Sequence, residues 1–194
     1  MRIITGTAKG KRLKSPKGLN TRPTADILKE VMFSAIQFDV ENAVVLDLFA
    51  GSGQLGMEAL SRGAKKAYFT DLSREAVAVI RENLRVVGFS DRAAVARLPA
   101  EAFLRTVKET FGIAFLDPPY EKDIIRKILS PLILKMSENG VIVCEHEKNL
   151  KLPEREGGFK IDRVYGHGFK SVTIYRPEFR RSPENENCHL SGEL

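Results

Sequence analysis

The chain has 194 residues, which is enough for one domain with a substantial core. Apolar residues make up 43% and charged residues 29%, and no apolar run approaches the roughly 20 residues that a membrane-spanning helix needs. The first residues carry charge but no apolar stretch, and Cys144 and Cys188 do not suggest a disulfide framework. These features exclude membrane-spanning and disulfide-rich secreted proteins and predict a cytoplasmic globular protein.

The net charge of +6 is concentrated at one end of the chain. Residues 1–22 contain seven lysines and arginines and no acid, whereas the remainder has 24 basic and 25 acidic residues. Clustered cations gain affinity for nucleic acid by releasing counterions from its phosphates. We therefore predict that residues 1–22 form a basic RNA-binding arm. A solvated terminus without a partner is the alternative.

From residue 23 onward, helical and strand patterns alternate. The apolar stripe in "PTADILKEVMFSAIQ" predicts a first helix. Strands are predicted over 43–49, 66–71, 93–97, 112–117 and 140–146, separated by helices over 53–63, 73–88, 100–110 and 122–137, the last broken at Pro131. Residues 158–166 and 169–176 have the pattern of an antiparallel hairpin. The sequence thus predicts an α/β domain over 23–176, with a mostly parallel, Rossmann-like sheet of seven strands and helices on both faces. The polar residues 177–194 are predicted to be disordered.

A glycine loop lies where the first predicted strand meets the next helix. In "DLFAGSGQLG" (47–56) the glycines follow the G-x-G-x-x-G spacing, and Asp71 follows Gly51 by twenty residues, at the end of the next predicted strand. This arrangement is typical of a nucleoside-cofactor site in which the second acid accepts from ribose hydroxyls. Asp47 would be poorly placed beside a pyrophosphate but well placed beside the sulfonium and ammonium of S-adenosylmethionine. The predicted cofactor-binding residues are Asp47, Phe49, Gly51, Gly53, Asp71 and Leu72.

The stretch "FLDPPY" (115–120) ends a buried strand with an acid and two prolines. The prolines have no N–H to donate and keep the loop stiff, so the Asp117 carboxylate and the Pro118 carbonyl form a site made of acceptors. Two acceptors can hold the hydrogens of an exocyclic amine and direct its lone pair at an electrophile. Tyr120 offers a ring on which a flipped-out base can stack. We predict Asp117, Pro118 and Tyr120 as catalytic residues. A strand that merely ends in a proline turn is the alternative. No histidine or cysteine spacing indicates a metal site.

Together these motifs resemble the RsmD family of class I S-adenosylmethionine-dependent methyltransferases. The resemblance rests on "MRIITGTAKGKRL", "RPTAD", "LDLFAGSG", "EALSRGA", "DPPY" and a closing "YG…YRPE", in order over residues 1–178. It implies methylation of N2 of one guanine in 16S rRNA, within the small ribosomal subunit or its assembly intermediate, by an enzyme that we expect to be a monomer. The substrate-binding residues expected on this basis are Arg2, Lys9, Lys11, Arg12, Arg22, Thr24, Pro119 and Tyr120.

The sequence departs from the family pattern at two positions. Pro99 stands where an acid near the adenine is expected, and Glu101 is the neighbouring candidate for that contact. Ser73 stands where an acid is common, two residues after Asp71.

Other functions remain open from the motifs alone. The amine site also suits methylation of adenine N6 or of a protein glutamine amide. The basic segment alone would suit a non-catalytic assembly factor that binds rRNA. A nicotinamide oxidoreductase would fit the glycines, but not Asp47 or the acceptor-rich loop.

Overall fold

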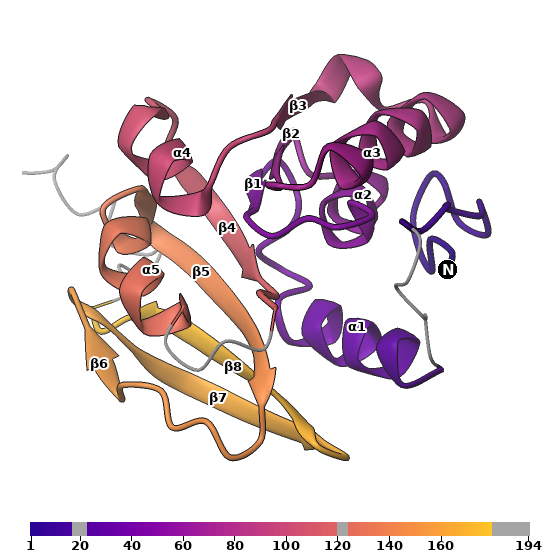
Figure 1. Cartoon of the computed structure of the whole chain (residues 1–194). Coiled ribbons are helices and arrows are strands. Elements are labelled where there is room, and N and C mark those ends of the chain that lie inside the picture. Colours follow the sequence, from indigo (N-terminus) through magenta and orange to yellow (C-terminus); the bar gives the residue numbers. More distant parts are fainter. Residues whose placement is uncertain (17–22, 120–123, 180–194) are drawn as a thin grey trace, which may run out of the picture.

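The structure is a computed structural model that describes residues 1–16, 23–119 and 124–179, with residues 23–26 described by their backbone only. One sheet of eight strands runs through the molecule in the order β3-β2-β1-β4-β5-β8-β7-β6 (Figure 1). The strands are β1 (Val44–Asp47), β2 (Lys66–Thr70), β3 (Ala93–Ala96), β4 (Phe111–Leu116), β5 (Met136–Glu147), β6 (Arg155–Glu156), β7 (Phe159–His167) and β8 (Lys170–Pro177). Strands β1 to β5 are parallel, and β8, β7 and β6 extend the sheet in antiparallel pairs.

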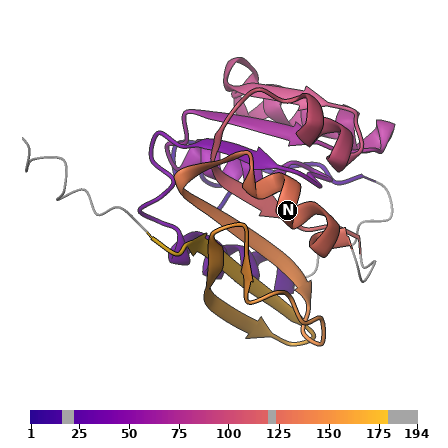
Figure 2. The ribbon, with the colours of Figure 1, turned by 90° about the vertical axis from the view of Figure 1, so that its left-hand side faces the viewer.

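Helices cover both faces of this sheet. They are α1 (Pro23–Ala35), α2 (Gln54–Ser61), α3 (Arg74–Val87), α4 (Ala100–Thr106) and α5 (Ile124–Ile133), with a short 3-10 turn η1 (Ser90–Arg92). Figures 1 and 2 show α1, α2 and α3 on one face and α4 and α5 on the other. Alternate residues of the buried strands point to the two faces, so Ile113 and Phe115 of β4 join one apolar cluster, and Ala114 and Leu116 join the other.

The predicted α/β class and the closing hairpin are confirmed, and four details differ. The sheet has eight strands because Arg155–Glu156 pairs with β7. Strand β5 starts at Met136, which pairs with Phe111 across an irregularity in register. Helix α4 ends at Thr106. Helix α5 continues through Pro131, because buried Ile128, Leu129, Leu132 and Ile133 anchor it on both sides of the proline.

The first sixteen residues pack against the domain. Ile3, Ala8 and Leu13 are buried in the same cluster as α1 and α2, and Arg2 and Arg12 form an antiparallel bridge within the segment. At Gly6, which has a φ of +84°, a Cβ would lie 1.7 Å from the Ser61 carbonyl oxygen, so only glycine permits this close approach. Residues 1–16 are therefore a docked segment of the domain, which is a structural finding that the charge pattern did not predict.

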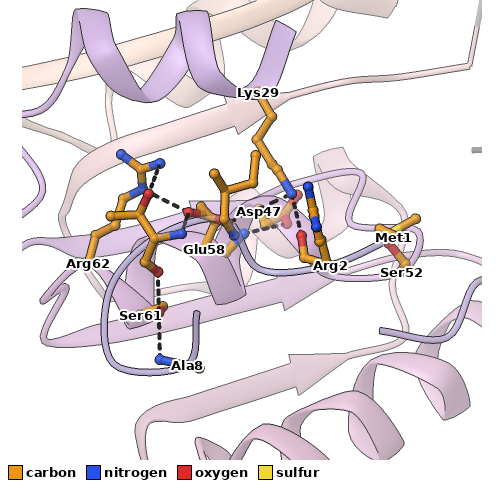
Figure 3. Close-up of polar contacts among 12 residues, drawn as sticks. Met1, Arg2, Ala8, Lys29, Asp47, Ser52, Glu58, Ser61 and Arg62 are labelled. Carbon is orange, nitrogen blue, oxygen red and sulfur yellow. Dashed lines mark hydrogen bonds and ion pairs between the residues drawn. The ribbon is translucent and has the colours of Figure 1, made fainter. Parts of the chain in front are cut away.

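A buried carboxylate fixes this docked segment (Figure 3). Glu58 of α2 is fully buried and accepts from the backbone N–H groups of Ile4 (2.8 Å) and Thr5 (2.9 Å) and from Arg62 Nε (2.9 Å). Lys29 of α1 lies 3.7 Å from the Glu58 carboxylate and donates to the Arg2 carbonyl (2.7 Å). Because Glu58 is paired and hydrogen-bonded, its charge is compensated inside the core.

Candidate active site

A pocket of about 620 Å³ opens at the carboxyl ends of the parallel strands, where ligands bind in open α/β sheets. Its wall combines the loops after β1, β2 and β4, the start of α4, two residues of α5 and the first residue of β8. The lining residues are Leu48, Phe49, Gly51, Asp71, Leu72, Leu98, Pro99, Ala100, Glu101, Asp117, Pro118, Pro119, Ile124, Ile128 and Lys170. The pocket thus brings together two motifs that lie more than 60 residues apart in the chain.

One side of the pocket is the glycine loop with Asp71. The Gly51 N–H donates to Asp71 Oδ2 (2.9 Å) and the Ser73 N–H donates to Oδ1 (2.8 Å), so the backbone fixes this carboxylate at the pocket wall. Each carboxylate oxygen has a second acceptor site that remains available to a hydroxyl group. Gly51 and Gly53 have φ angles of 54° and 77°, which glycine adopts without strain. At Gly56, a Cβ would meet the Phe69 ring at 2.3 Å, so this glycine lets α2 approach β2.

Asp47 lies beneath the loop and is only 3% exposed. The Gly56 N–H donates to Asp47 Oδ2 (3.0 Å). Burial raises the pKa of Asp47 to about 7, the hydrogen bond from Gly56 opposes this shift, and the negative charge of Asp71 adds to it. Neither Asp47 nor Gly53 belongs to the pocket lining. The structure thus places both in support of the loop, and their contact with a cofactor stays a prediction.

The other side of the pocket is the loop after β4. Asp117 follows the last residue of β4, Pro118 is buried, and Pro119 is exposed at the rim. Burial raises the pKa of Asp117 to about 7, and the negative charge of Glu145 raises it further, while the positive charge of Lys170 lowers it. Tyr120 lies outside the described residues, so its predicted stacking role is not addressed.

The predicted RNA-binding residues are mostly on the docked segment. Arg2, Lys9, Lys11 and Arg12 are all exposed, although Lys11 Nζ also donates to the Val87 carbonyl (3.1 Å) at the end of α3. Arg22 lies outside the described residues, and Thr24 lies in the first turn of α1, where only the backbone is described. Their role in RNA binding stays a prediction.

The docked segment is also joined to the glycine loop. Buried Asn83 of α3 donates to the carbonyls of Lys14 and Ser52, both at 3.0 Å, and accepts from the Lys14 N–H (2.8 Å). Ser52 Oγ also lies 3.0 Å from Met1 Sδ. One side chain therefore connects the glycine loop with the segment predicted to bind RNA.

Several pocket residues were absent from the predicted site. Pro99 and Glu101 both line the pocket, which agrees with the position expected for the missing acid. Lys170 lines it too and forms an ion pair with Glu145 of β5. The sequence itself places Glu145 near the end of the strand predicted over 140–146, although β5 continues to Glu147, but Lys170 reaches this edge only through the antiparallel register of β8. Its recognition therefore required the tertiary structure.

Neither a histidine nor a cluster of potential metal ligands provides a further candidate in the described part of the chain. His146 is buried, and its ring nitrogens lie 2.8 Å from the Glu147 carbonyl and 2.8 Å from Thr173 Oγ1, so both ring nitrogens have structural partners. Within residues 1–16, 23–119 and 124–179, no group of three or more His, Cys, Asp or Glu side chains is placed to hold a metal ion. In the same part of the chain, no helix has the length and apolarity to cross a membrane.

The fold and pocket define a class I methyltransferase architecture, and similar solved structures agree. The structure of "Putative methyltransferase yhhF from Escherichia coli" superposes with a TM-score of 0.81 at 28% identity and covers 93% of this chain and 99% of that one. Residues 1–176 match the family model described as "Conserved hypothetical protein 95". The chain therefore belongs to this family, the RsmD family of methyltransferases.

Two relatives have more specific names. "Putative rRNA methyltransferase YlbH" of Bacillus subtilis is 39% identical over 91% of this chain and 98% of its own length. "Ribosomal RNA small subunit methyltransferase D" of Escherichia coli K12 is 29% identical over 92% of this chain and 90% of its own length. The similarity to both therefore covers at least 90% of each chain, and the family match over residues 1–176 includes the docked N-terminal segment.

Proposed function

We propose that the protein transfers a methyl group from S-adenosylmethionine to the exocyclic N2 of one guanine in 16S rRNA. One observation carries the proposal. Asp117 and Pro118, which offer only hydrogen-bond acceptors, line the same pocket as Gly51 and Asp71 of the predicted nucleoside-cofactor site. The names of both relatives support rRNA as the substrate, and the name of the Escherichia coli relative supports that of the small subunit. The choice of guanine N2 comes from the family resemblance of the sequence motifs.

The pocket side chains have distinct tasks in this reaction. Asp71 would hold the ribose hydroxyls of the cofactor, and Phe49 and Leu72 would cover its apolar surface. S-adenosylmethionine, when bound, supplies an electrophilic methyl group. The apolar lining would exclude water from the site and strengthen its electrostatic interactions.

Asp117 and the Pro118 carbonyl would act on the substrate amine. Both would accept from the N–H groups of N2, which favours a pyramidal nitrogen whose lone pair is no longer delocalised into the ring, and which stabilises the positive charge that develops on nitrogen. The proton released from N2 passes to the Asp117 carboxylate. A pKa of about 7 suits this transfer, because a base works best when its pKa lies near the operating pH.

Methylation of adenine N6 is the second candidate, because it would use the same amine site. The decisive experiment incubates the purified protein and labelled S-adenosylmethionine with small-subunit rRNA from a strain that lacks the modification. This RNA should be offered both naked and in assembled 30S particles. We expect label on N2 of a single guanine, identified by nucleoside analysis and mapping. Label on adenine would favour the second candidate, and absence of label on both substrates would reject the proposal.

Cofactor choice can be tested separately by calorimetry with S-adenosylhomocysteine. Asp71→Ala should weaken binding, because each lost hydrogen bond to a charged acceptor contributes about 1.5–3 kcal/mol. Asp91→Ala, at an exposed position in η1, is the matched control. Equal affinity of Asp71→Ala and the wild type would mean that the ribose is held elsewhere, and tight binding of NAD by the wild type would contradict the cofactor assignment.

A further inference from the structure

Three adjacent strands place a row of charged side chains at one edge of the sheet. Strands β4, β5 and β8 are neighbours in that order (Figure 1). Asp117 and Glu145 each directly follow one member of a register pair, Leu116 and Cys144, so they lie side by side. Lys170 pairs with Glu147 and is therefore diagonal to Glu145 on the same face.

The last two members of this row form a largely buried ion pair. Lys170 Nζ contacts Glu145 Oε1, and their side chains are 21% and 9% exposed. Lys170 also lines the pocket, together with Asp117 and Pro118. Removing such a pair from water costs more free energy than most ion pairs return, so stability alone is a weak reason for placing it there.

The position of the pair matters because acids dominate this part of the molecule. Asp47 approaches from β1, Asp71 follows β2, Glu101 lies in α4 and Glu145 in β5, and Lys170 is the cation among the described residues that line the pocket. Burial raises the pKa of Asp117, the charges of Glu145 and Asp47 raise it further, and Lys170 acts in the opposite direction. The Lys170–Glu145 pair carries no net charge. The negative charge of Glu145 is therefore compensated when Asp117 beside it is ionised.

We propose that Lys170, anchored by Glu145, is a positioning residue that keeps the Asp117 carboxylate ionised and therefore able to accept both the amine hydrogen and its proton. This inference rests on the proposed function of Asp117 and goes beyond it by assigning a role to a side chain outside the two motifs. An ammonium group has three N–H donors, so Lys170 can keep its contact with Glu145 while it faces Asp117.

The direct test follows the Asp117 carboxyl by NMR in the protein without cofactor or RNA, labelled with ¹³C at aspartate side chains. Lys170→Met should raise the titration midpoint of Asp117 by about one to two pH units, because a nearby opposite charge is lost. Glu145→Gln should lower it, because a nearby like charge is lost. Lys170→Arg should restore the wild-type value. The control is Arg155→Met in β6, which removes the cation of an exposed ion pair with Glu178 and should leave the midpoint unchanged.

The second test measures single-turnover methyl transfer against pH. Lys170→Met should lose about tenfold in rate at pH 7 and recover much of it at high pH, whereas Glu145→Gln should extend the active range to lower pH. Midpoints for Asp117 that do not move in either variant would overturn the inference. A rate lost equally at every pH, with a raised KM for RNA, would also overturn it and make Lys170 a phosphate contact. The NMR result is independent of whether RNA is the substrate, so failure here can be distinguished from failure of the proposed function.

Discussion

Asp47→Asn should stabilise the cofactor-free protein at neutral and higher pH, and its stability relative to the wild type should rise with pH. Asp47 is 3% exposed, and its pKa is raised from 3.8 to about 7, with burial as the largest cause. The unfolded chain releases this proton near pH 4 and the folded chain near pH 7, so between these values the folded state binds more protons. Stability therefore falls as the pH rises through this window.

The size of this change in stability follows from the shift in the pKa of Asp47. A shift of about three units corresponds to about 4 kcal/mol, at roughly 1.4 kcal/mol per unit, when the group is fully ionised. The asparagine oxygen can still accept from the Gly56 N–H, but its amide hydrogens need partners that the core does not provide, which reduces the gain. Because this penalty does not depend on pH, we expect Asp47→Asn to be about 2 kcal/mol less stable than the wild type at pH 4 and about 2 kcal/mol more stable at pH 8.

The assay is urea unfolding followed by circular dichroism, because the chain contains no tryptophan. Asp47→Asn and the wild type are compared from pH 4 to pH 8, so that contributions from all other titrating groups cancel. Asp91→Asn, exposed in η1, is the control and should show no trend with pH. An advantage that stays constant across this range, or a variant that is less stable at pH 8, would refute the reasoning.

Three further predictions concern other parts of the molecule. Asp117→Ala should lower turnover by about 10²–10³ and leave S-adenosylhomocysteine affinity nearly unchanged, whereas Asp117→Asn should retain more activity through its carbonyl; turnover within a few-fold of wild type for the alanine variant would remove the mechanism. Glu58→Gln should destabilise the protein by about 3–5 kcal/mol in urea unfolding, because the buried donors around Glu58 lose a charged acceptor and Lys29 loses this anionic partner; an unchanged midpoint would mean that this carboxylate does not fix residues 1–16. Neutralising Arg2, Lys9 and Arg12 should reduce the slope of log K against log salt for RNA by about 0.7–0.9 per contact, as measured by filter binding, and should do so on unrelated RNAs as well; an unchanged slope would place the RNA contacts elsewhere.

Arg2, Lys9 and Arg12 are the cations to substitute, because the structure gives Lys11 and Lys14 contacts that hold residues 1–16 on the domain. Lys11 and Lys14 looked equivalent to them in the sequence, yet Lys11 donates to the Val87 carbonyl and Lys14 pairs with Glu82 at 2.6 Å. Substituting these two would disturb the docking of the segment as well as its charge. A loss of RNA binding in such variants could not be assigned to phosphate contacts.

Local sequence patterns were sufficient for the fold class and for both halves of the pocket. The alternation of apolar strands with amphipathic helices indicated a mostly parallel sheet, because each element must bury its own apolar face. Gly51, Asp71 and Asp117 could be assigned to one site because they follow parallel strands, whose carboxyl ends meet at one edge of the sheet. Such inferences depend only on the spacing of motifs and on the order of strands and helices along the chain, and both can be read from the sequence.

Only the tertiary structure decided which residues from distant segments meet. Lys170 reaches the pocket through the register of an antiparallel strand, and a shift of one residue would have turned it to the other face. The basic segment packs on α2 because Glu58, a buried acid in the middle of a helix, provides acceptors for its backbone. Asp47 was recognised as important, but its burial beneath the glycine loop depends on how α2 packs against β1. Long-range pairing of this kind is set by the packing of the whole chain, and no local pattern of residues encodes it.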